Sequence, residues 1–151
     1  MHCDKDFSPS HHSESGADQS IIMFDDIQQI EIKQDHLNIK SVTINRNQIH
    51  LVVEYGGGCE THEFKLYGFS GLARGIFPTE AKLYLSHNAN GDLCKVLIRE
   101  ELVFDLTPLG ILAVQQGYHG NTIILKVHAP GETTPCAPEP AYQITDGCIP
   151  C

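Results

Sequence analysis

Apolar and polar residues alternate along short segments over most of the chain between residues 21 and 129. The clearest case is the segment 49–55, where Ile, Leu, Val and Tyr occupy every second position, as in a β-strand with one buried face. Similar alternation recurs in the segments 30–32, 37–44, 62–68, 81–87, 94–98, 102–106 and 121–128. Within 37–44 the alternation changes phase at Lys40 and Ser41, which indicates a β-bulge.

Only one segment favours a helix. Residues 109–116 lack strict alternation, and Gly117 follows them as a natural stop. About seven or eight short strands and at most one short helix are typical of an all-β fold. We therefore predict an antiparallel β-sandwich, of which an immunoglobulin-like arrangement is one version.

The same pattern divides the chain into three parts. Residues 1–20 are polar and predict a disordered linker, because they cannot bury enough apolar surface to offset the entropy of ordering. Residues 21–129 carry the predicted sandwich. Residues 130–151 are rich in Pro, Thr and Glu and predict a tail with no packed core of its own. Both ends are thus expected to be disordered around one domain.

Composition and charge narrow the classes of partner. The chain has 10 basic and 19 acidic residues, and its net charge of −9 repels phosphate backbones, so we expect no nucleic-acid partner. No apolar run approaches the roughly 18 residues of a membrane span. The expected partner is a protein or a glycan.

Two pairs of cysteine and histidine are the candidate chemistry. Cys59 and His62 follow three glycines in the run Tyr-Gly-Gly-Gly-Cys-Glu-Thr-His. His87 and Cys94 flank a segment that contains Asn-Gly, a strong hairpin signal. If consecutive strands alternate in direction, both connections lie at the same end of the sandwich. Because three of the four side chains keep the phase of their apolar neighbours, we expect the two pairs to meet there.

Three interpretations of this convergence stay open. The first is a structural zinc site with Cys59, His62, His87 and Cys94 as ligands, in a binding or accessory module. The second is a Cys59–Cys94 disulfide in a cell-envelope domain that binds a protein or glycan partner. The third is a hydrolase that uses a cysteine nucleophile or a zinc-bound water, although we assign no catalytic residue. Asp92 and Glu60 are expected to support the site from a second layer.

Three blocks of sequence within residues 49–127 carry a resemblance to other proteins. They are Tyr-Gly-Gly-Gly-Cys-x-x-His-x-Phe-x-Leu, Leu-x-Leu-x-His-Asn-x-x-Gly-Asp-x-Cys and Phe-Asp-Leu-x-Pro-Leu. The blocks resemble those of small uncharacterised bacterial proteins, many of them exported or lipid-anchored. The resemblance implies no activity, but it implies a location in the cell envelope or outside the cell, with the cytoplasm as the alternative. It thereby favours the disulfide interpretation.

Four further cysteines have less defined roles. Cys3, next to a polar spacer, resembles the lipid-anchored cysteine of a bacterial lipoprotein, and a free thiol is the alternative. Cys136, Cys148 and Cys151 favour a disulfide within the tail, and metal capture by the same three is the alternative.

Overall fold

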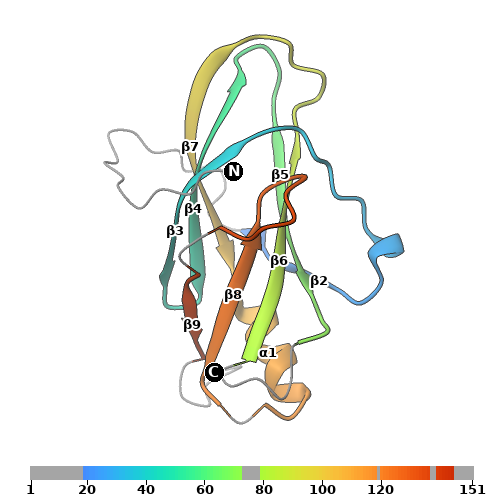
Figure 1. Ribbon diagram of the computed structural model, residues 1–151, viewed down its shortest axis with the longest axis vertical. Coiled ribbons are helices and arrows are strands. Elements are labelled where there is room, and N and C mark those ends of the chain that lie inside the picture. Colours follow the sequence, from blue (N-terminus) through green and yellow to red (C-terminus); the bar gives the residue numbers. More distant parts are fainter. Residues whose placement is uncertain (1–18, 73–78, 119, 137–138, 145–151) are drawn as a thin grey trace.

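The computed structural model describes residues 19–72, 79–118, 120–136 and 139–144 and contains two packed β-sheets with a short helix at one end (Figure 1). Its elements are β1 (Gln19–Ser20), β2 (Ile22–Phe24), the 3-10 helix η1 (Ile27–Gln29), β3 (Asn38–Asn45), β4 (Gln48–Gly57), β5 (Glu63–Phe69), β6 (Thr79–Asn88), β7 (Val96–Asp105), α1 (Thr107–Gln115), β8 (Thr122–His128) and β9 (Ala141–Gln143). The predicted β-sandwich is therefore confirmed. The segments 94–98 and 102–106 belong to one strand, β7, and 30–32 forms no strand.

The two sheets are mixed. One has the strand order β1-β7-β4-β3 and the other has the order β2-β5-β6-β8-β9. Three neighbouring pairs are parallel, namely β1–β7, β2–β5 and β6–β8, and the other pairs are antiparallel. The chain leaves β6 for the other sheet before it returns as β8, so these two neighbours run in the same direction. The immunoglobulin-like version, which needs two antiparallel sheets, is not the arrangement found.

The core consists of the apolar positions of the alternation. On β4, Ile49, Leu51 and Val53 are fully buried, whereas His50 and Glu54 lie on the outer face. The facing sheet contributes the buried side chains Ala81, Leu83, Leu85, Ile123, Leu125 and Val127. Each large aliphatic side chain buried in this way stabilises the fold by roughly 1.5–3 kcal/mol. The predicted bulge is also confirmed, because the β3–β4 register shifts between Ile39 and Ser41.

Helix α1 follows β7 and covers one end of the core (Figure 1). The carboxylate of Asp105 accepts hydrogen bonds from the backbone N–H and the hydroxyl of Thr107, at 2.9 and 2.7 Å. Leu109 and Ala113, four residues apart on one face, are fully buried. The helix thus forms where it was predicted and begins two residues earlier. Among the described residues, no helix has the length and apolarity to span a membrane.

Two connections cross between the sheets at the same end of the molecule. β4 and β7 belong to one sheet, and β5 and β6 belong to the other. Gly57 at the end of β4 pairs with Val96 at the start of β7, and Phe64 near the start of β5 pairs with His87 near the end of β6. The β4–β5 and β6–β7 connections, residues 58–62 and 89–95, therefore lie together, and we call them the rim.

The Asn-Gly signal does not make a β-hairpin. Asn90 and Gly91 have the positive φ values of a tight turn, 53° and 74°. The strands on either side, however, belong to different sheets. The hairpin prediction is therefore wrong. The chain crosses from one sheet to the other at this turn, because β7 pairs with β4 and not with β6.

The sandwich extends beyond residue 129, where the sequence pattern places the start of a tail. β9 pairs with β8, and its central residue Tyr142 is fully buried and donates a hydrogen bond to the side chain of Asn47 at 2.8 Å. Cys136 is also fully buried. At the other end, the last two residues of the predicted linker form β1. Most of the linker and the end of the tail lie outside the described residues.

Truncation of Tyr142 tests whether this segment belongs to the core. We expect Tyr142→Ala to lower the free energy of unfolding by about 3 kcal/mol or more, because it leaves a large cavity. Urea denaturation provides the measurement. Gln143→Ala changes the exposed neighbour on the same strand and should cost no more than about 0.5 kcal/mol. Equal effects from the two variants would contradict the assignment of β9 to the core.

Candidate functional site

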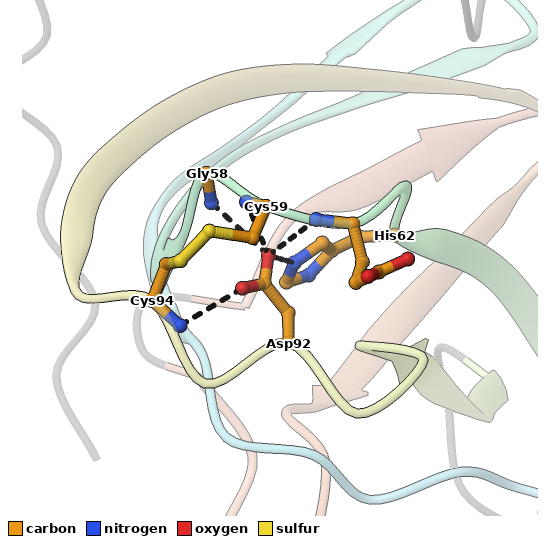
Figure 2. The surroundings of a disulfide bond; sticks show 6 residues. Gly58, Cys59, His62, Asp92 and Cys94 are labelled. Carbon is orange, nitrogen blue, oxygen red and sulfur yellow. Dashed lines mark hydrogen bonds and ion pairs between the residues drawn. A yellow bond between two sulfur atoms is a disulfide. The ribbon is translucent and has the colours of Figure 1, made fainter.

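A disulfide bond between Cys59 and Cys94 joins the two loops of the rim (Figure 2). The Cα atoms of these residues are 5.8 Å apart, a spacing that disulfides normally have. A bond that closes a loop of 35 residues stabilises the folded chain by about 3–4 kcal/mol in the chain-entropy model. The structure therefore contains the second of the three predicted arrangements.

The carboxylate of Asp92 is the centre of the rim. Its Oδ2 atom accepts hydrogen bonds from the backbone N–H groups of Gly58, Cys59 and Glu60, at 3.0, 3.1 and 3.1 Å (Figure 2). Oδ1 accepts a further bond from the N–H of Cys94 at 3.0 Å. Three successive N–H groups aimed at one oxygen form a cradle for negative charge. The carboxylate thus ties the glycine loop to the loop that carries Asp92 itself.

Glycine is required at two positions of this loop. Gly58 has a φ of +117°, which side chains rarely allow. A Cβ atom at Gly57 would lie 2.7 Å from Nε2 of His62 and 2.9 Å from Oδ2 of Asp92. The run of glycines therefore lets the backbone curl around the carboxylate and approach it closely.

His62 supplies the remaining bond to Asp92. Its Nε2 atom lies 2.8 Å from Oδ2, and both side chains are almost completely buried. The hydrogen bond from His62, together with the backbone donors of Cys94, Glu60 and Cys59, holds the pKa of Asp92 well below its usual range, although burial opposes the shift. Asp92 is therefore a buried, ionised carboxylate at neutral pH.

A chain of hydrogen bonds continues from Asp92 into the core. Nδ1 of His62 lies 2.8 Å from Nε2 of His87, and Nδ1 of His87 lies 3.1 Å from the backbone oxygen of Asp35. The carboxylate and the carbonyl can only accept, so the ring nitrogens beside them must both carry protons. The contact between the two rings requires one more. The histidine pair therefore holds one proton more than two neutral rings, which balances the charge of Asp92.

His87 is the less favourable place for this extra proton. Burial lowers the pKa of His87, the carbonyl of Asp35 opposes the shift, and the nearby charge of His62 lowers the pKa further. The rings of Tyr55 and Phe64 enclose the pair, with Phe64 stacked on His87 at a centroid distance of 4.8 Å. Asp92 and the histidine pair thus carry no net charge together, and aromatic rings separate them from the core.

The four predicted site residues do come together, but they are not arranged as zinc ligands. The sulfur atoms of Cys59 and Cys94 are bonded to each other and offer no thiolate. Both ring nitrogens of His62, and those of His87, already take part in hydrogen bonds. Within the described residues, the candidate metal-ligand atoms that lie close together belong to Cys59, Asp92 and Cys94. The arrangement does not fit a four-ligand zinc site, and zinc stays a prediction for the reduced chain.

The disulfide also argues against a cysteine nucleophile, the first version of the third interpretation. A cysteine nucleophile needs a thiolate, which neither bonded sulfur provides. Asp92 was predicted to support the site from a second layer, but its carboxylate accepts five hydrogen bonds and lies at the centre of the rim. Glu60 takes part through its backbone N–H, while its side chain is exposed.

Sequence reasoning missed one participant, the segment 33–36. Its backbone pairs with β6 at His87, through bonds from the N–H of His87 to the oxygen of Lys33 at 2.9 Å and from the N–H of Asp35 to the oxygen of His87 at 3.1 Å. The carboxylate of Asp35 also accepts from the N–H of Ala89 at 2.7 Å. No periodicity marks this segment, because it acts mainly through its backbone.

The other cysteine predictions lie at the limits of the described residues. Cys136 is disulfide-bonded. The predicted tail partners Cys148 and Cys151, and the predicted anchor Cys3, lie outside the described residues.

Asp92→Asn tests the role of the buried carboxylate. We expect the variant to melt several degrees below the wild type at pH 7, because it loses a charged acceptor of five hydrogen bonds. The lowered pKa of Asp92 contributes stability above the unfolded value of about 3.9, and this stability is lost as the pH falls below that value. Calorimetry should therefore show a gap between variant and wild type that shrinks below about pH 4.

A matched control is Asp25→Asn, which changes an exposed carboxylate on the loop after β2. It should leave the melting temperature within about a degree of the wild type across the same range. A gap for Asp92→Asn that widens on acidification would contradict the proposed state of the carboxylate.

Comparison with known proteins identifies the fold. No protein-family model matches the chain, and no curated protein sequence matches it. Solved structures with the same architecture include a NigD-like immunity protein from Bacteroides caccae (TM-score 0.55, 20% identity, 80% of this chain and 60% of that one). They also include a protein of unknown function from Bacteroides vulgatus (TM-score 0.52, 15% identity, 84% and 56%). A third is a protein from Bacteroides fragilis described as a candidate lipoprotein (TM-score 0.58, 12% identity, 87% and 72%).

These likenesses concern the architecture alone, because all the identities are low. The chain spans about three fifths of the length of the immunity protein and slightly less of the protein of unknown function. The chain is therefore a β-sandwich that is similar in structure to uncharacterised, immunity and lipoprotein-like proteins of Bacteroides.

Proposed function

We propose that the chain is a disulfide-stapled binding domain of the bacterial cell envelope that holds a protein partner at its rim. The observation that carries the proposal is a set of exposed apolar side chains on a rigid support. Leu93, Val96 and Leu97 are 88%, 62% and 70% exposed and follow one another from the rim into β7. Large apolar side chains left in solvent within five residues of one another mark a candidate interaction site, although Val96 and Leu97, as successive strand residues, point to opposite faces of the sheet.

The loop that carries Leu93 is held in place by a disulfide and by hydrogen bonds. Leu93 lies between Asp92, whose carboxylate holds the opposite loop, and Cys94, which is bonded to Cys59. A Cβ atom at Gly58 would lie 3.3 Å from a methyl group of Val96, so the glycine loop also packs closely against the start of β7. A surface that is already ordered loses little entropy on binding. The rim is therefore suited to present apolar anchors to a partner.

The envelope location has two supports. Disulfides persist in oxidising compartments and are rare in the reducing cytosol. One protein of similar structure is described as a candidate lipoprotein. We extend the envelope placement to this chain, with the predicted lipid anchor at Cys3 as its means of attachment.

The redox state in the native cell tests the staple. We expect acid quenching of intact cells, alkylation and mass spectrometry without reductant to recover a Cys59–Cys94 cross-linked peptide. The expectation follows from the closed S–S bond and the oxidising compartment proposed. Recovery of both thiols in alkylated form would reject the disulfide. Elemental analysis would then test the predicted zinc site of Cys59, His62, His87 and Cys94.

Site-specific cross-linking tests the partner. A photoreactive residue at position 97 should give an adduct with one envelope protein in native cells. The same residue at position 114, where Val114 is 50% exposed on α1, should not. The variant Leu93→Ser with Leu97→Ser should weaken the purified complex by about tenfold or more, because apolar anchors carry most of the binding energy. Equal adducts at both positions, or an unchanged affinity, would contradict a partner held at the rim.

A further inference from the structure

One edge of the four-stranded sheet is long and largely unpaired. β7 pairs with β4 along its whole length, but on its other side β1 covers only Phe104 and Asp105. Among the residues that the structure describes, no strand lies beside residues 97–103 on this side, and we call them the β7 edge. A free edge presents unpaired N–H and C=O groups, which can pair with the backbone of another chain.

Hydrogen bonds at the end of β7 show which backbone groups face this edge. The N–H of Ile21, which follows β1, donates to the oxygen of Asp105 at 3.0 Å. The N–H of Leu106 donates to the oxygen of Asn47, on the side of β4, at 2.6 Å. Since successive strand residues direct their backbone groups to opposite sides, and the β4–β7 register has no shift, odd-numbered residues face the edge. The residues that offer both groups to a partner are Leu97, Arg99, Glu101 and Val103.

The other sheet edges are less suited to pairing. β3 is the opposite edge strand of the same sheet, but a bulge lies between Ile39 and Ser41, and Lys40 lies within it. Bulges and lysines are devices that keep edge strands from pairing. The edge strands of the other sheet, β2 and β9, have three residues each. The β7 edge is longer than these, and no bulge interrupts it.

The exposed apolar side chains of β7 are placed as an added strand requires. Val96 and Leu97 point to opposite faces of the sheet, and both are largely exposed. Ile98, on the same face as Val96, is only partly buried against the core. A flat partner surface could cover one face alone. An added strand would place side chains beside both, because its own residues alternate between the two faces.

A second copy of the chain fits the β7 edge poorly. Two copies of β7 that pair about a two-fold axis must join odd-numbered residues to odd-numbered residues, so one residue on the axis lies opposite itself. In the middle of the edge that residue is Arg99, Glu100 or Glu101. Like charges directly opposite each other destabilise a sheet. The occupant is therefore a different chain.

The charges along β7 favour a basic segment. Arg99 forms an ion pair with Glu54 on the neighbouring strand. Glu100 accepts a hydrogen bond from the hydroxyl of Tyr55 at 2.6 Å, but among the described residues it forms no ion pair. A Lys or Arg opposite Glu100 on an added strand would supply the missing cation. The net charge of −9 attracts a basic partner as well.

We propose that the partner of the rim binds as an extended segment that adds a strand to the β7 edge. Apolar side chains of this segment lie beside Val96 and Leu97, and a Lys or Arg lies opposite Glu100. The backbone groups of the edge provide affinity, and the side chains on its two faces provide specificity. This inference rests on the function proposed above and gives the chemistry of that partner.

The test uses the full oxidised chain and randomised ten-residue peptides displayed on phage as the probe. The selected peptides should alternate apolar and polar residues and contain Lys or Arg. When a selected peptide binds, NMR should show amide exchange slowed by about tenfold or more at Leu97, Arg99, Glu101 and Val103, because these amides gain acceptors. The even-numbered amides already bond to β4, and they and the free edge of β3 should keep their exchange rates.

Matched peptides separate backbone pairing from side-chain docking. N-methylation of the alternate residues that donate to β7 should weaken binding by about tenfold or more, because hydrogen bonds to the edge are lost. N-methylation of the residues between them should change the affinity by less than about threefold. Glu100→Gln should weaken a basic peptide by about threefold or more, whereas Glu63→Gln, which changes an exposed carboxylate on β5, should not.

The proposal is overturned if no peptide is selected, if the selected peptides are acidic, if a bound peptide leaves exchange at the four edge amides unchanged, or if the two N-methylated peptides bind equally. Cross-linking at position 97 detects a protein partner in whatever way it binds. An adduct there without slowed exchange would reject the added strand and keep the rim partner. Peptide pairing at the edge without an adduct in cells would contradict the proposed function instead.

Discussion

The buried negative charge of Asp92 is the constraint on which the rim depends. A carboxylate removed from water is very unfavourable unless hydrogen bonds and an opposite charge compensate it. Here the backbone of residues 58–60, the N–H of Cys94 and the ring of His62 provide that compensation. The donors come from both loops of the rim, so the two loops must adopt one arrangement for the charge to be tolerated.

The disulfide and the carboxylate act on the same two loops in different ways. The Cys59–Cys94 bond limits how far the loops can separate, and it does so in the unfolded chain as well. The hydrogen bonds to Asp92 fix the orientation of the loops, and they exist only in the folded chain. The pair of histidines extends this fixed arrangement to the backbone of Asp35, which closes the core beneath the rim.

The fold holds the rim and the strands in place in different ways. The rim is a pair of crossover loops, and the disulfide and the hydrogen bonds to Asp92 keep its exposed residue Leu93 in position, whereas Leu97 is held by the pairing of β7 with β4. On the outer face of the five-stranded sheet, by contrast, the ladder of β6 and β8 holds side chains such as Tyr84 and His128 in place. A fold whose inner faces are mainly apolar thus leaves its loop ends available for recognition.

The sequence by itself determined the sandwich, most strand positions and the convergence of Cys59, His62, His87 and Cys94, because a period of two is a local property and the short connections at 58–62 and 89–95 reverse the chain. Tertiary structure alone decided that β6 and β7 lie in different sheets, since strand partners are chosen by long-range packing. It also decided that the sulfur atoms of Cys59 and Cys94 are joined, because a disulfide and a metal site require the same convergence of side chains. The central role of Asp92 was likewise decided there, because its donors are backbone N–H groups, which leave no mark in the side-chain pattern.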